Sequence, residues 1–510
     1  MISPNLPIVV IGAGAAGAVV ASRLSENEKQ SVLLLEAGPD SQSFQEPDGI
    51  KSPNFLKALQ VTERTFSNLH VQRTALQESV WYPRGRGMGG SSAVNAMVAM
   101  VGMAQDFERW KNLHGCDGWD WNDVEPVFRA LPFATTTVDQ SDWGVIDSAL
   151  VDALTSMGIS RNDHLSSDSR TEEAVGAASL LFDGTQRSST NLAYMDDARG
   201  RPNLTVRGNC EVDSIVMSGT RAVGVKLSDG SVIDASGVVL CAGAIHSPAV
   251  LLRSDIRRRG IGKGLKDHPA VAFSLQLREA AKYRFAISTI SRLSSTIGSS
   301  DIHLLPMNAV STSDTKSGAL LAAVMEVTST GSVRLGSNGQ LEVKFSLLST
   351  EHDRQVMRDA VAYALQALEQ KALADVVSAT YCDNVGTRCD WLAAATNDQL
   401  DNWMERNVGV YAHAGCTLRM GSIDDENAVV DTDGAVIGYE ALWVCDASIF
   451  PDLPRANPQL AVTMVAERIA PRIAGWLDQQ RYGLAYQSDR QVLHWRSGWR
   501  QRPDGPEDYC

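Results

Sequence analysis

The chain has 510 residues, of which 44% are hydrophobic and 21% are charged, and its formal net charge is −14. This length suffices for two or three domains with substantial cores, and the composition is that of a soluble globular protein. A surface of this charge repels phosphate backbones, which argues against nucleic acid as a partner.

Targeting and metal signals are absent from the sequence. It has no run of 18 or more apolar residues, so we expect no membrane span. The start, MISPNLPIVVIGAG, has neither a basic segment nor a cleavable apolar core, which favours a cytoplasmic location. The eight cysteines are scattered without a CxxC pair, and the nine histidines are equally dispersed. This pattern suits neither a disulfide framework nor a zinc site, so we expect no bound metal.

The opening of the chain predicts a nucleotide-binding βαβ unit. Ile8 to Ile11 form an apolar β-branched run, GAGAAG follows, and AVVASRLSE has apolar residues at helical spacing. Gly12 permits the tight turn, Gly14 lets the backbone approach a pyrophosphate, and Gly17 lets helix and strand pack closely. The free N–H groups at the start of the helix suit phosphates.

A second apolar strand, SVLLLEAG, ends in Glu36, which lies 19 residues beyond Gly17. A carboxylate at this position can accept hydrogen bonds from a ribose diol. Strand, turn, helix and acid together predict nucleotide binding, and the motif leaves NAD and FAD open.

Later segments predict further strand–helix units, separated by a Ser-rich stretch and a stretch with the pattern of paired strands. The stretch 85–110 predicts a glycine-rich loop and then a helix that something flat approaches closely, and 237–256 predicts a buried strand and a helix. The Ser-rich stretch 288–303 predicts a surface loop, with a mobile lid as the alternative. GSVRLGSNGQLEVKFSLLS predicts strands joined at SNG, DRQVMRDAVAYALQALEQ predicts a helix, and 442–470 predicts a strand, a Pro-rich loop and a helix.

Taken in order, these stretches resemble the glucose–methanol–choline (GMC) oxidoreductases, FAD enzymes that oxidise alcohols. The resemblance runs from residue 8 to about 475. The stretch from Gly85 is similar to the family's first signature, and GAIHSPAVLL is similar to the first half of the second. IGKGLKDHP, GWDW and RPNLTV also fall where members carry similar sequences. The second signature normally ends in Ser-Gly-x-Gly, whereas this chain has RSDIRRRGIGKG.

We therefore expect an α/β (α+β overall) protein with two domains. A Rossmann-like FAD-binding domain would be discontinuous, over 1–150, 200–270 and 425–475. A substrate-binding domain with an antiparallel sheet backed by helices would span 271–424, with parts of 151–199. The residues from 482 to 510 would form a C-terminal tail.

The resemblance also implies which residues contact FAD. Glu36 would hold the adenosine ribose, the turn after the first strand the pyrophosphate, and Val212 the adenine through its backbone. Gly87 and 95–98 would line the isoalloxazine side, and 446–447 would lie at the ribityl chain and pyrophosphate. The full implied set is Gly12, Gly14, Ala15, Ala16, Gly17, Glu36, Ala37, Gly87, Asn95, Ala96, Met97, Val98, Val212, Asp446 and Ala447.

One departure from the family pattern bears on how FAD is attached. Some members bind FAD covalently through a histidine just before the asparagine that matches Asn95. This chain has Val94 there, which cannot bond to flavin, so we expect non-covalent FAD.

The stretch YAHAGCTLRMG contains His413, which by itself could be a packing residue, a metal ligand or a base. The resemblance places His413 and Asn457 at the two catalytic positions of the family. Neutral imidazole, with an ordinary pKa of about 6.5, suits removal of a hydroxyl proton. An asparagine amide can instead donate a hydrogen bond to the developing alkoxide. We interpret Cys416 as a small buried filler and His268 in KDHP as a structural hydrogen-bonding residue.

The resemblance implies oxidation of a small-molecule alcohol to an aldehyde or ketone. His413 would take the hydroxyl proton, hydride would pass to flavin N5, and O2 or another electron acceptor would reoxidise the flavin. A hydroxynitrile-lyase-like enzyme with structural FAD, a mycofactocin-associated dehydrogenase and a catalytically idle flavoprotein are the alternatives. The stretch NVGVYAHAGCTLRMG also resembles the His region of aryl or furanic alcohol oxidases. The alcohol and the oligomeric state remain open at this point.

Overall fold

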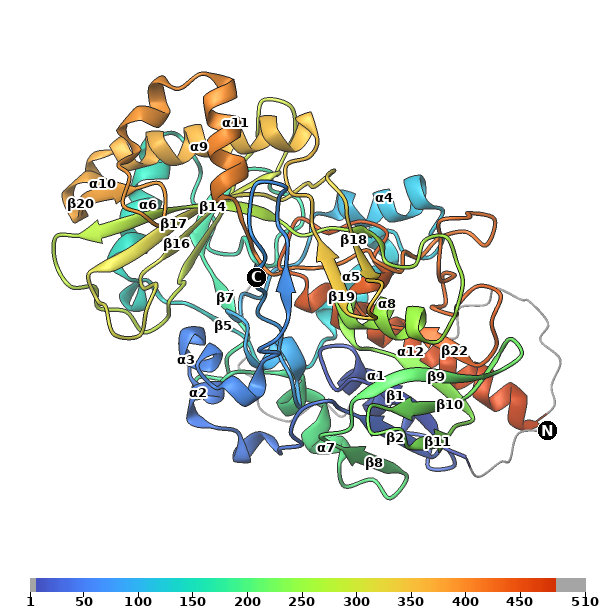
Figure 1. Cartoon of the computed structure of the whole chain (residues 1–510). Helices are drawn as coiled ribbons and strands as arrows, with labels where there is room; N and C mark the ends of the chain where they lie inside the picture. Colours follow the sequence, from blue (N-terminus) through green and yellow to red (C-terminus); the bar gives the residue numbers. More distant parts are fainter. Residues whose placement is uncertain (1–5, 483–510) are drawn as a thin grey trace.

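A five-stranded parallel sheet collects strands from three distant parts of the chain (Figure 1). The structure, a computed structural model, describes residues 6–482. The sheet order is β22 (Leu442–Val444), β12 (Gly237–Leu240), β1 (Ile8–Ile11), β2 (Val32–Leu35) and β8 (Leu204–Arg207). The four strands other than β8 are fully buried, as expected of parallel strands covered on both faces. The predicted Rossmann-like sheet is thereby confirmed.

The turn between β1 and helix α1 (Gly17–Leu24) is very tight. A Cβ atom added to Gly17 would lie 1.8 Å from the carbonyl oxygen of Gly12. Gly12 itself has φ = +95°, a conformation that favours glycine. Helix α12 (Gln459–Tyr482) packs beside α1, so the first and last described helices cover the same region of the sheet.

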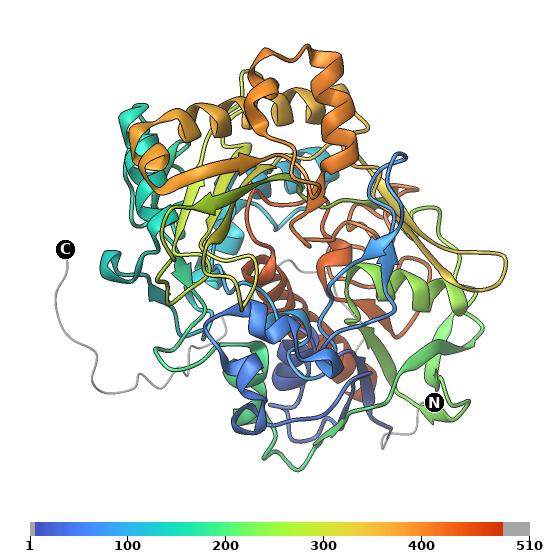
Figure 2. The same cartoon turned by 60° about the vertical axis from the view of Figure 1, so that its left-hand side comes forward.

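A second sheet is antiparallel and lies at the opposite end of the molecule. Its order is β16 (Ile302–Met307), β17 (Ser317–Val324), β14 (Pro269–Leu277) and β20 (Val377–Tyr381), and β21 (Gly409–Val410) also pairs with β14. Figure 2 shows α9 (Glu351–Glu369), α10 (Lys371–Val376) and α11 (Asn397–Asn407) on its outer side. Helix α6 (Val145–Ser156) also packs on this sheet. The predicted antiparallel sheet backed by helices is confirmed, including the helix predicted at α9.

Side chains alternate between the two faces of this sheet, as the pleat requires. In β14, Val271, Phe273 and Leu275 are buried, whereas Ala272 and Ser274 are exposed. Phe273 lies opposite Leu320 in β17, so the helix-covered face is the apolar core. The other face, which carries Leu305 and Leu321 opposite each other, is directed towards the parallel sheet.

The predicted hairpin with the SNG turn forms, but in a separate sheet. Strands β18 (Gly331–Leu335) and β19 (Leu341–Lys344) pair with each other, and β18 pairs with β13 (Lys263–Leu265). This small sheet therefore combines β13, from the end of the predicted flavin-domain segment 200–270, with β18 and β19, from the predicted substrate domain. The exact domain boundaries stay a prediction.

The expectation of a surface loop at 288–303 is confirmed for the middle, where 294–299 form a loop with Thr296 and Ile297 exposed, and it is wrong for the two ends. Most of its first part is strand β15 (Thr289–Arg292), which pairs with β6 (Ala174–Ala177) and is fully buried. The polar side chains are buried because they have partners. Thr289 donates through N and Oγ1 to Asp147 Oδ1, at 2.9 and 2.8 Å, and Ser291 Oγ donates to the Leu304 carbonyl. Serine content alone does not reveal such partners.

The remaining helices and strands lie outside the two five-stranded sheets and the hairpin sheet. A three-stranded antiparallel sheet consists of β9 (Val212–Ser218), β10 (Arg221–Leu227) and β11 (Val232–Asp234), and α8 (Gly243–Arg253) follows β12. The others are α2 (Asp48–Lys51), α3 (Phe55–Leu59), β3 (His70–Val71), β4 (Val80–Trp81), α4 (Ala104–His114), α5 (Trp121–Arg129), β5 (Thr136–Thr137), β7 (Ser179–Leu180) and α7 (Asp196–Ala198). Within residues 6–482, no helix has both the length and the apolar character needed to cross a bilayer. The tail predicted from residue 482 lies, beyond that residue, outside the described part of the chain.

Candidate active site

A cavity of about 380 Å³ extends from the carboxyl ends of the parallel strands to the inner face of the antiparallel sheet. In open α/β sheets, ligands bind at this edge of the strands. Thirteen of the fifteen residues implied to contact FAD line the cavity, as do both predicted catalytic residues. The two exceptions are Gly17, which is packed against Gly12, and Gly87.

Gly14 leaves room for a ligand at the start of α1. A Cβ atom added there would find Gly90 Cα, at 3.9 Å, as its nearest neighbour. Gly14 therefore opens onto the cavity, whereas Gly17 closes against the preceding turn. This contrast separates the ligand-facing glycine from the packing glycine of the motif.

Glu36 lies at the nucleotide end of the cavity and joins three segments. Its carboxylate accepts hydrogen bonds from the backbone N–H groups of Ala13 (2.8 Å), Gly38 (2.9 Å) and Gly87 (2.8 Å). Gly87 is thus placed behind the cavity wall, where its amide supports Glu36. A carboxylate offers about four acceptor positions, so capacity remains for a ribose hydroxyl.

Asp446 holds the ends of two parallel strands together. It follows β22, and its carboxylate accepts hydrogen bonds from Gly243 N (2.8 Å) and Ser247 Oγ at the start of α8 and from Ser448 N (2.7 Å). Burial raises the pKa of this carboxyl. The side chain therefore supports the cavity floor where β12 and β22 end.

Asn95 is half-buried and links the buried side chains of Arg187 and Gln459. Its Oδ1 accepts from Met97 N (3.0 Å) and Arg187 Nη1 (2.8 Å), and its Nδ2 donates to Gln459 Oε1. The Nε2 atom of Gln459 is buried at the cavity wall without a hydrogen-bond partner in the described chain. A buried unsatisfied donor is costly, so this position suits a ligand that carries an acceptor.

His413 lies between a second histidine and an asparagine. Its Nδ1 is 2.9 Å from Nδ1 of His268, and its Nε2 is 3.2 Å from Nδ2 of Asn457. His413 is 8% exposed and His268 is fully buried. The structure thus brings together His413 and Asn457, which are 44 residues apart in sequence.

The surroundings of His413 keep its imidazole neutral. Burial lowers the pKa well below the ordinary 6.5, and His268, Arg84 and His303 lower it further. Burial likewise lowers the pKa of His268 to about 4. An imidazole without its second proton is ready to accept one at neutral pH.

Asp267 and Tyr82 were not predicted as site residues, yet they hold the backbone of His413. Asp267 accepts from His413 N (2.9 Å) and from the Tyr82 hydroxyl (2.6 Å), and burial raises the pKa of Asp267 to about 6. Lys266 Nζ donates to Asp452 at 2.7 Å. The whole KDHP motif therefore supports the site. The sequence contains one signal for this role. In KDHP, two charged residues precede a histidine, and none of them has an evident partner nearby in the sequence.

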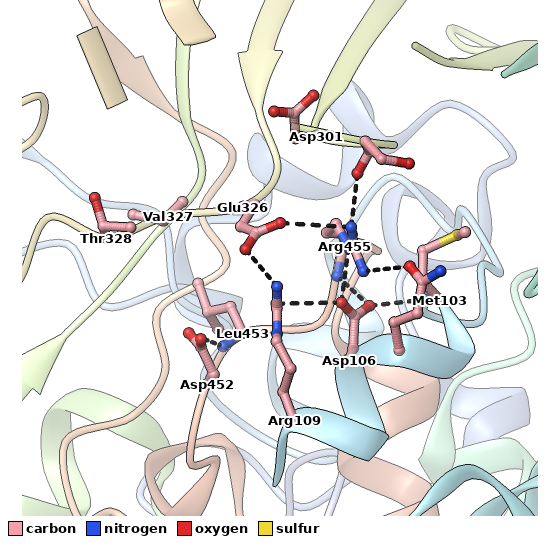
Figure 3. Close-up of polar contacts among 12 residues, drawn as sticks. Met103, Asp106, Arg109, Asp301, Glu326, Val327, Thr328, Asp452, Leu453 and Arg455 are labelled. Atoms are coloured by element: carbon pink, nitrogen blue, oxygen red, sulfur yellow. Dashed lines mark hydrogen bonds and ion pairs between the residues drawn. The ribbon is translucent and has the colours of Figure 1, made fainter. Parts of the chain in front are cut away.

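A buried ion-pair network fixes the loop that carries Asn457 (Figure 3). Arg455 donates through its backbone N and its Nε to the two oxygens of Asp106, both at 2.8 Å, and through Nη1 to the Ser299 carbonyl at 2.6 Å. Glu326 contacts both Arg455 and Arg109. The network connects α4 with segments that border the antiparallel sheet, two residues before Asn457.

The residues present fit FAD. Three features account for this fit: the space at Gly14, the acceptor capacity at Glu36, and the orphaned donor of Gln459, two residues after Asn457. Val94 is buried beside Ile50 and Ala58, so its side chain is part of an apolar cluster. Cys416 is also buried, and burial raises its thiol pKa. Residues 6–482 contain no group of three or more His, Cys, Asp or Glu placed to hold a metal ion.

Comparison with known proteins agrees with this geometry. Two family models described as GMC oxidoreductase match residues 7–270 and 327–466. The chain is 30% identical to an oxygen-dependent choline dehydrogenase of Pectobacterium carotovorum subsp. carotovorum (strain PC1), over 91% of this chain and 94% of that protein. It is also 30% identical to a 5-(hydroxymethyl)furfural oxidase of Methylovorus sp. (strain MP688), over 91% and 98%.

Solved structures lead to the same family. The crystal structure of a pyridoxine 4-oxidase from Mesorbium loti superimposes with a TM-score of 0.81 at 26% identity, over 92% of this chain and 99% of that one. The glycine turn and the paired His413 and Asn457 lie inside the matched segments, whereas the cavity lining at Ile287, Leu305, Met307 and Leu321 lies between them. The chain therefore belongs to the GMC oxidoreductase family, and it is an FAD-dependent oxidoreductase that acts on CH–OH donors.

Proposed function

We propose that the protein oxidises an alcohol to the aldehyde or ketone, with His413 as the base and Asn457 as an orienting donor. When bound, FAD supplies the acceptor for the hydride. The single observation that carries the assignment is the contact of Asn457 Nδ2 with His413 Nε2, at 3.2 Å, at the wall of the cavity.

The hydrogen bonds select one tautomer of His413. Asn457 Nδ2 can only donate, so His413 Nε2 holds a lone pair and its proton resides on Nδ1. That Nδ1–H then donates to Nδ1 of His268, which in turn keeps its own proton on Nε2. The basic nitrogen of His413 is thus the one beside Asn457, where a substrate hydroxyl would lie.

His268 supports the charge that His413 acquires. Once His413 has taken the hydroxyl proton on Nε2, both of its nitrogens carry protons, and the Nδ1–H remains bonded to His268 Nδ1. Because two protonated imidazoles cannot share this contact, His268 stays neutral and acts as the acceptor. General-base help of this kind contributes roughly 10²–10⁴-fold to a rate.

Asn457 has a different chemistry. Its amide cannot take the proton, but its Nδ2–H can turn from His413 towards the alkoxide oxygen as negative charge develops there. Donors directed at a developing oxyanion are worth more inside a cavity from which water is excluded than in water. The pair therefore divides proton removal and charge stabilisation between two side chains.

The test is anaerobic stopped-flow reduction of the enzyme-bound flavin by an alcohol. We expect His413→Ala to retain yellow, bound FAD and to lose about 10²–10⁴-fold in the rate of reduction. Asn457→Ala should keep the base and lose less. Wild-type enzyme whose flavin is not bleached by any alcohol would favour a lyase with structural FAD, and unchanged reduction in His413→Ala would remove His413 from its role.

A further inference from the structure

The acidic residues of the cavity are confined to its nucleotide end. Among the described residues that line the cavity, the carboxylates are Glu36, Glu211 and Asp446. Glu36 and Asp446 are bonded to backbone amides at the ends of the parallel strands. Glu211 directly precedes β9, beside Val212. None of the three belongs to the wall that the antiparallel sheet contributes.

The wall opposite the nucleotide end is apolar. It is formed by Leu305 and Met307 of β16 and Leu321 of β17, and Leu305 pairs directly with Leu321. Ile287, Phe55 and Phe66 complete this part of the lining. The inner face of the antiparallel sheet thus offers a substrate neither a carboxylate nor an ammonium group.

Among the residues that line the cavity, the charged side chain that acts on His413 is positive; the Asp267 carboxylate, which accepts from His413 N, is not part of the lining. Arg84 lines the cavity, its Nη2 donates to the carbonyl of Ala412, and its Cζ lies 4.9 Å from the centre of the Tyr82 ring. Arg84 also contributes to lowering the pKa of His413. A cationic substrate placed here would lose its water, find no counter-ion at the wall, and be repelled by the guanidinium.

We propose that the substrate is an uncharged alcohol with an apolar body, aryl or branched alkyl, and that ammonium alcohols such as choline are excluded. The inference rests on the proposed function. The rings of Phe66 and Tyr411, which line the cavity, would attract a cation, but this attraction is weaker than the desolvation penalty of an unpaired buried charge. The same rings favour an aryl group, which packs against them without any charge to desolvate.

Two matched pairs of alcohols test the proposal, because each pair differs in charge and hardly in shape. One pair is 3,3-dimethyl-1-butanol and choline, and the other is 4-tert-butylbenzyl alcohol and 4-(trimethylammonio)benzyl alcohol. The measurement is anaerobic reduction of the flavin in the intact holoenzyme, expressed as the reduction rate constant divided by the apparent dissociation constant.

We expect the neutral member of at least one pair to be favoured by roughly 10²-fold or more. Equal or greater efficiency with the ammonium member of the reacting pair would overturn the charge argument and leave the proposed function intact. If another alcohol reduces the flavin but none of the four compounds does, this inference alone is overturned; a flavin that no alcohol reduces would overturn the proposed function as well.

A variant of the apolar wall provides an independent check. Leu321→Glu places a carboxylate opposite Leu305, and Leu321→Gln is its uncharged control of the same size. We expect the efficiency of flavin reduction by choline, divided by that with 3,3-dimethyl-1-butanol, to be about tenfold or more higher in Leu321→Glu than in Leu321→Gln. An equal ratio in the two folded variants would count against the proposal, and if Leu321→Glu does not fold, the wild-type pairs still decide.

Discussion

At the residue scale, the site depends on how the neighbours of His413 set its protonation. The imidazole is buried, contacts a second histidine, and lies near the guanidinium of Arg84. Each of these features disfavours a second proton. The imidazole is therefore neutral over the whole neutral range, and it gains a second proton only when the pH falls through a pKa that lies well below 6.5.

This leads to a prediction about pH. With a neutral alcohol, the rate of flavin reduction should be flat from about pH 6.5 to 8 and fall only at more acid pH, where His413 becomes protonated. Arg84→Met removes a positive charge, so the pKa of His413 should rise and the acid limb should move to higher pH. Arg84→Lys keeps the charge and serves as the control. Coinciding acid limbs in the two variants would show that Arg84 does not act through its charge.

At the scale of single elements, the turn between β1 and α1 contains one glycine that folding requires and another that we expect cofactor binding to require. A side chain at Gly17 collides with the Gly12 carbonyl oxygen at 1.8 Å, whereas a side chain at Gly14 meets only Gly90 Cα at 3.9 Å. The two positions of one motif therefore require glycine for different physical reasons.

The expected outcome is a divergence between two variants. Gly14→Val should give soluble protein with a native far-UV spectrum that no longer retains FAD, because the side chain occupies the place of the pyrophosphate. Gly17→Ala should instead lose folded, soluble protein. Gel filtration, circular dichroism and the flavin absorbance of the purified variants measure this, and a Gly14→Val protein with normal flavin content would refute the placement of the pyrophosphate.

The loop before α12 is the second element whose geometry matters for the chemistry. Arg455 is 3% exposed and is bonded to Asp106, which is fully buried. Removing one partner of a buried pair typically costs 3–5 kcal/mol. Because Arg455 lies two residues before Asn457, the same loss should also displace the Asn457 amide.

We expect Arg455→Met to slow the rate of flavin reduction by up to ~10²-fold with FAD still bound, since small misplacements near reacting groups have effects of this size. If Arg455 acts by positioning Asn457, the double variant with Asn457→Ala should be hardly slower than Asn457→Ala alone. Arg455→Lys should recover part of the rate. Arg23→Met is the matched control, because the Arg23–Glu467 pair (2.8 Å) also anchors α12 but not the Asn457 loop. Fully additive losses would assign Arg455 to stability only.

At the scale of the whole molecule, the cavity is enclosed by both sheets and by the segments that cross between them. Its lining includes residues from β1, β2, β16, β17 and the start of α12. A ligand that fills such a cavity binds the folded chain and not the unfolded one. Folding and cofactor binding are therefore linked by mass action.

Removal of FAD should accordingly lower the thermal midpoint, and its return should restore it. At a free FAD concentration 100 times the dissociation constant, the linkage is worth about 2.7 kcal/mol. FMN, which lacks the adenosine that the Glu36 region would hold, should restore less. Differential scanning fluorimetry of the apo protein with each flavin measures the effect, and an apo midpoint insensitive to FAD would contradict it.

The sequence by itself determined the elements whose signals are local. The apolar run of β1, the glycine turn and the helical periodicity of α9 each lie within one segment, and the structure has strands and helices there. Several motifs in a fixed order also indicated the family before any contact was known. Local pattern failed at β15, because the burial of Ser291 and Thr289 depends on Leu304 and Asp147, which lie elsewhere in the chain.

Only the tertiary structure decided the surroundings of His413 and Asn457. His268 and His413 are 145 residues apart in sequence, and Arg455 and Asp106 are 349 apart. The absence of carboxylates from the inner face of the antiparallel sheet, within the described chain, likewise depends on which side of β16 and β17 turns inward. Contacts of this kind arise from the packing of two sheets against each other, and periodicity within a segment carries no information about which distant side chain will be opposite.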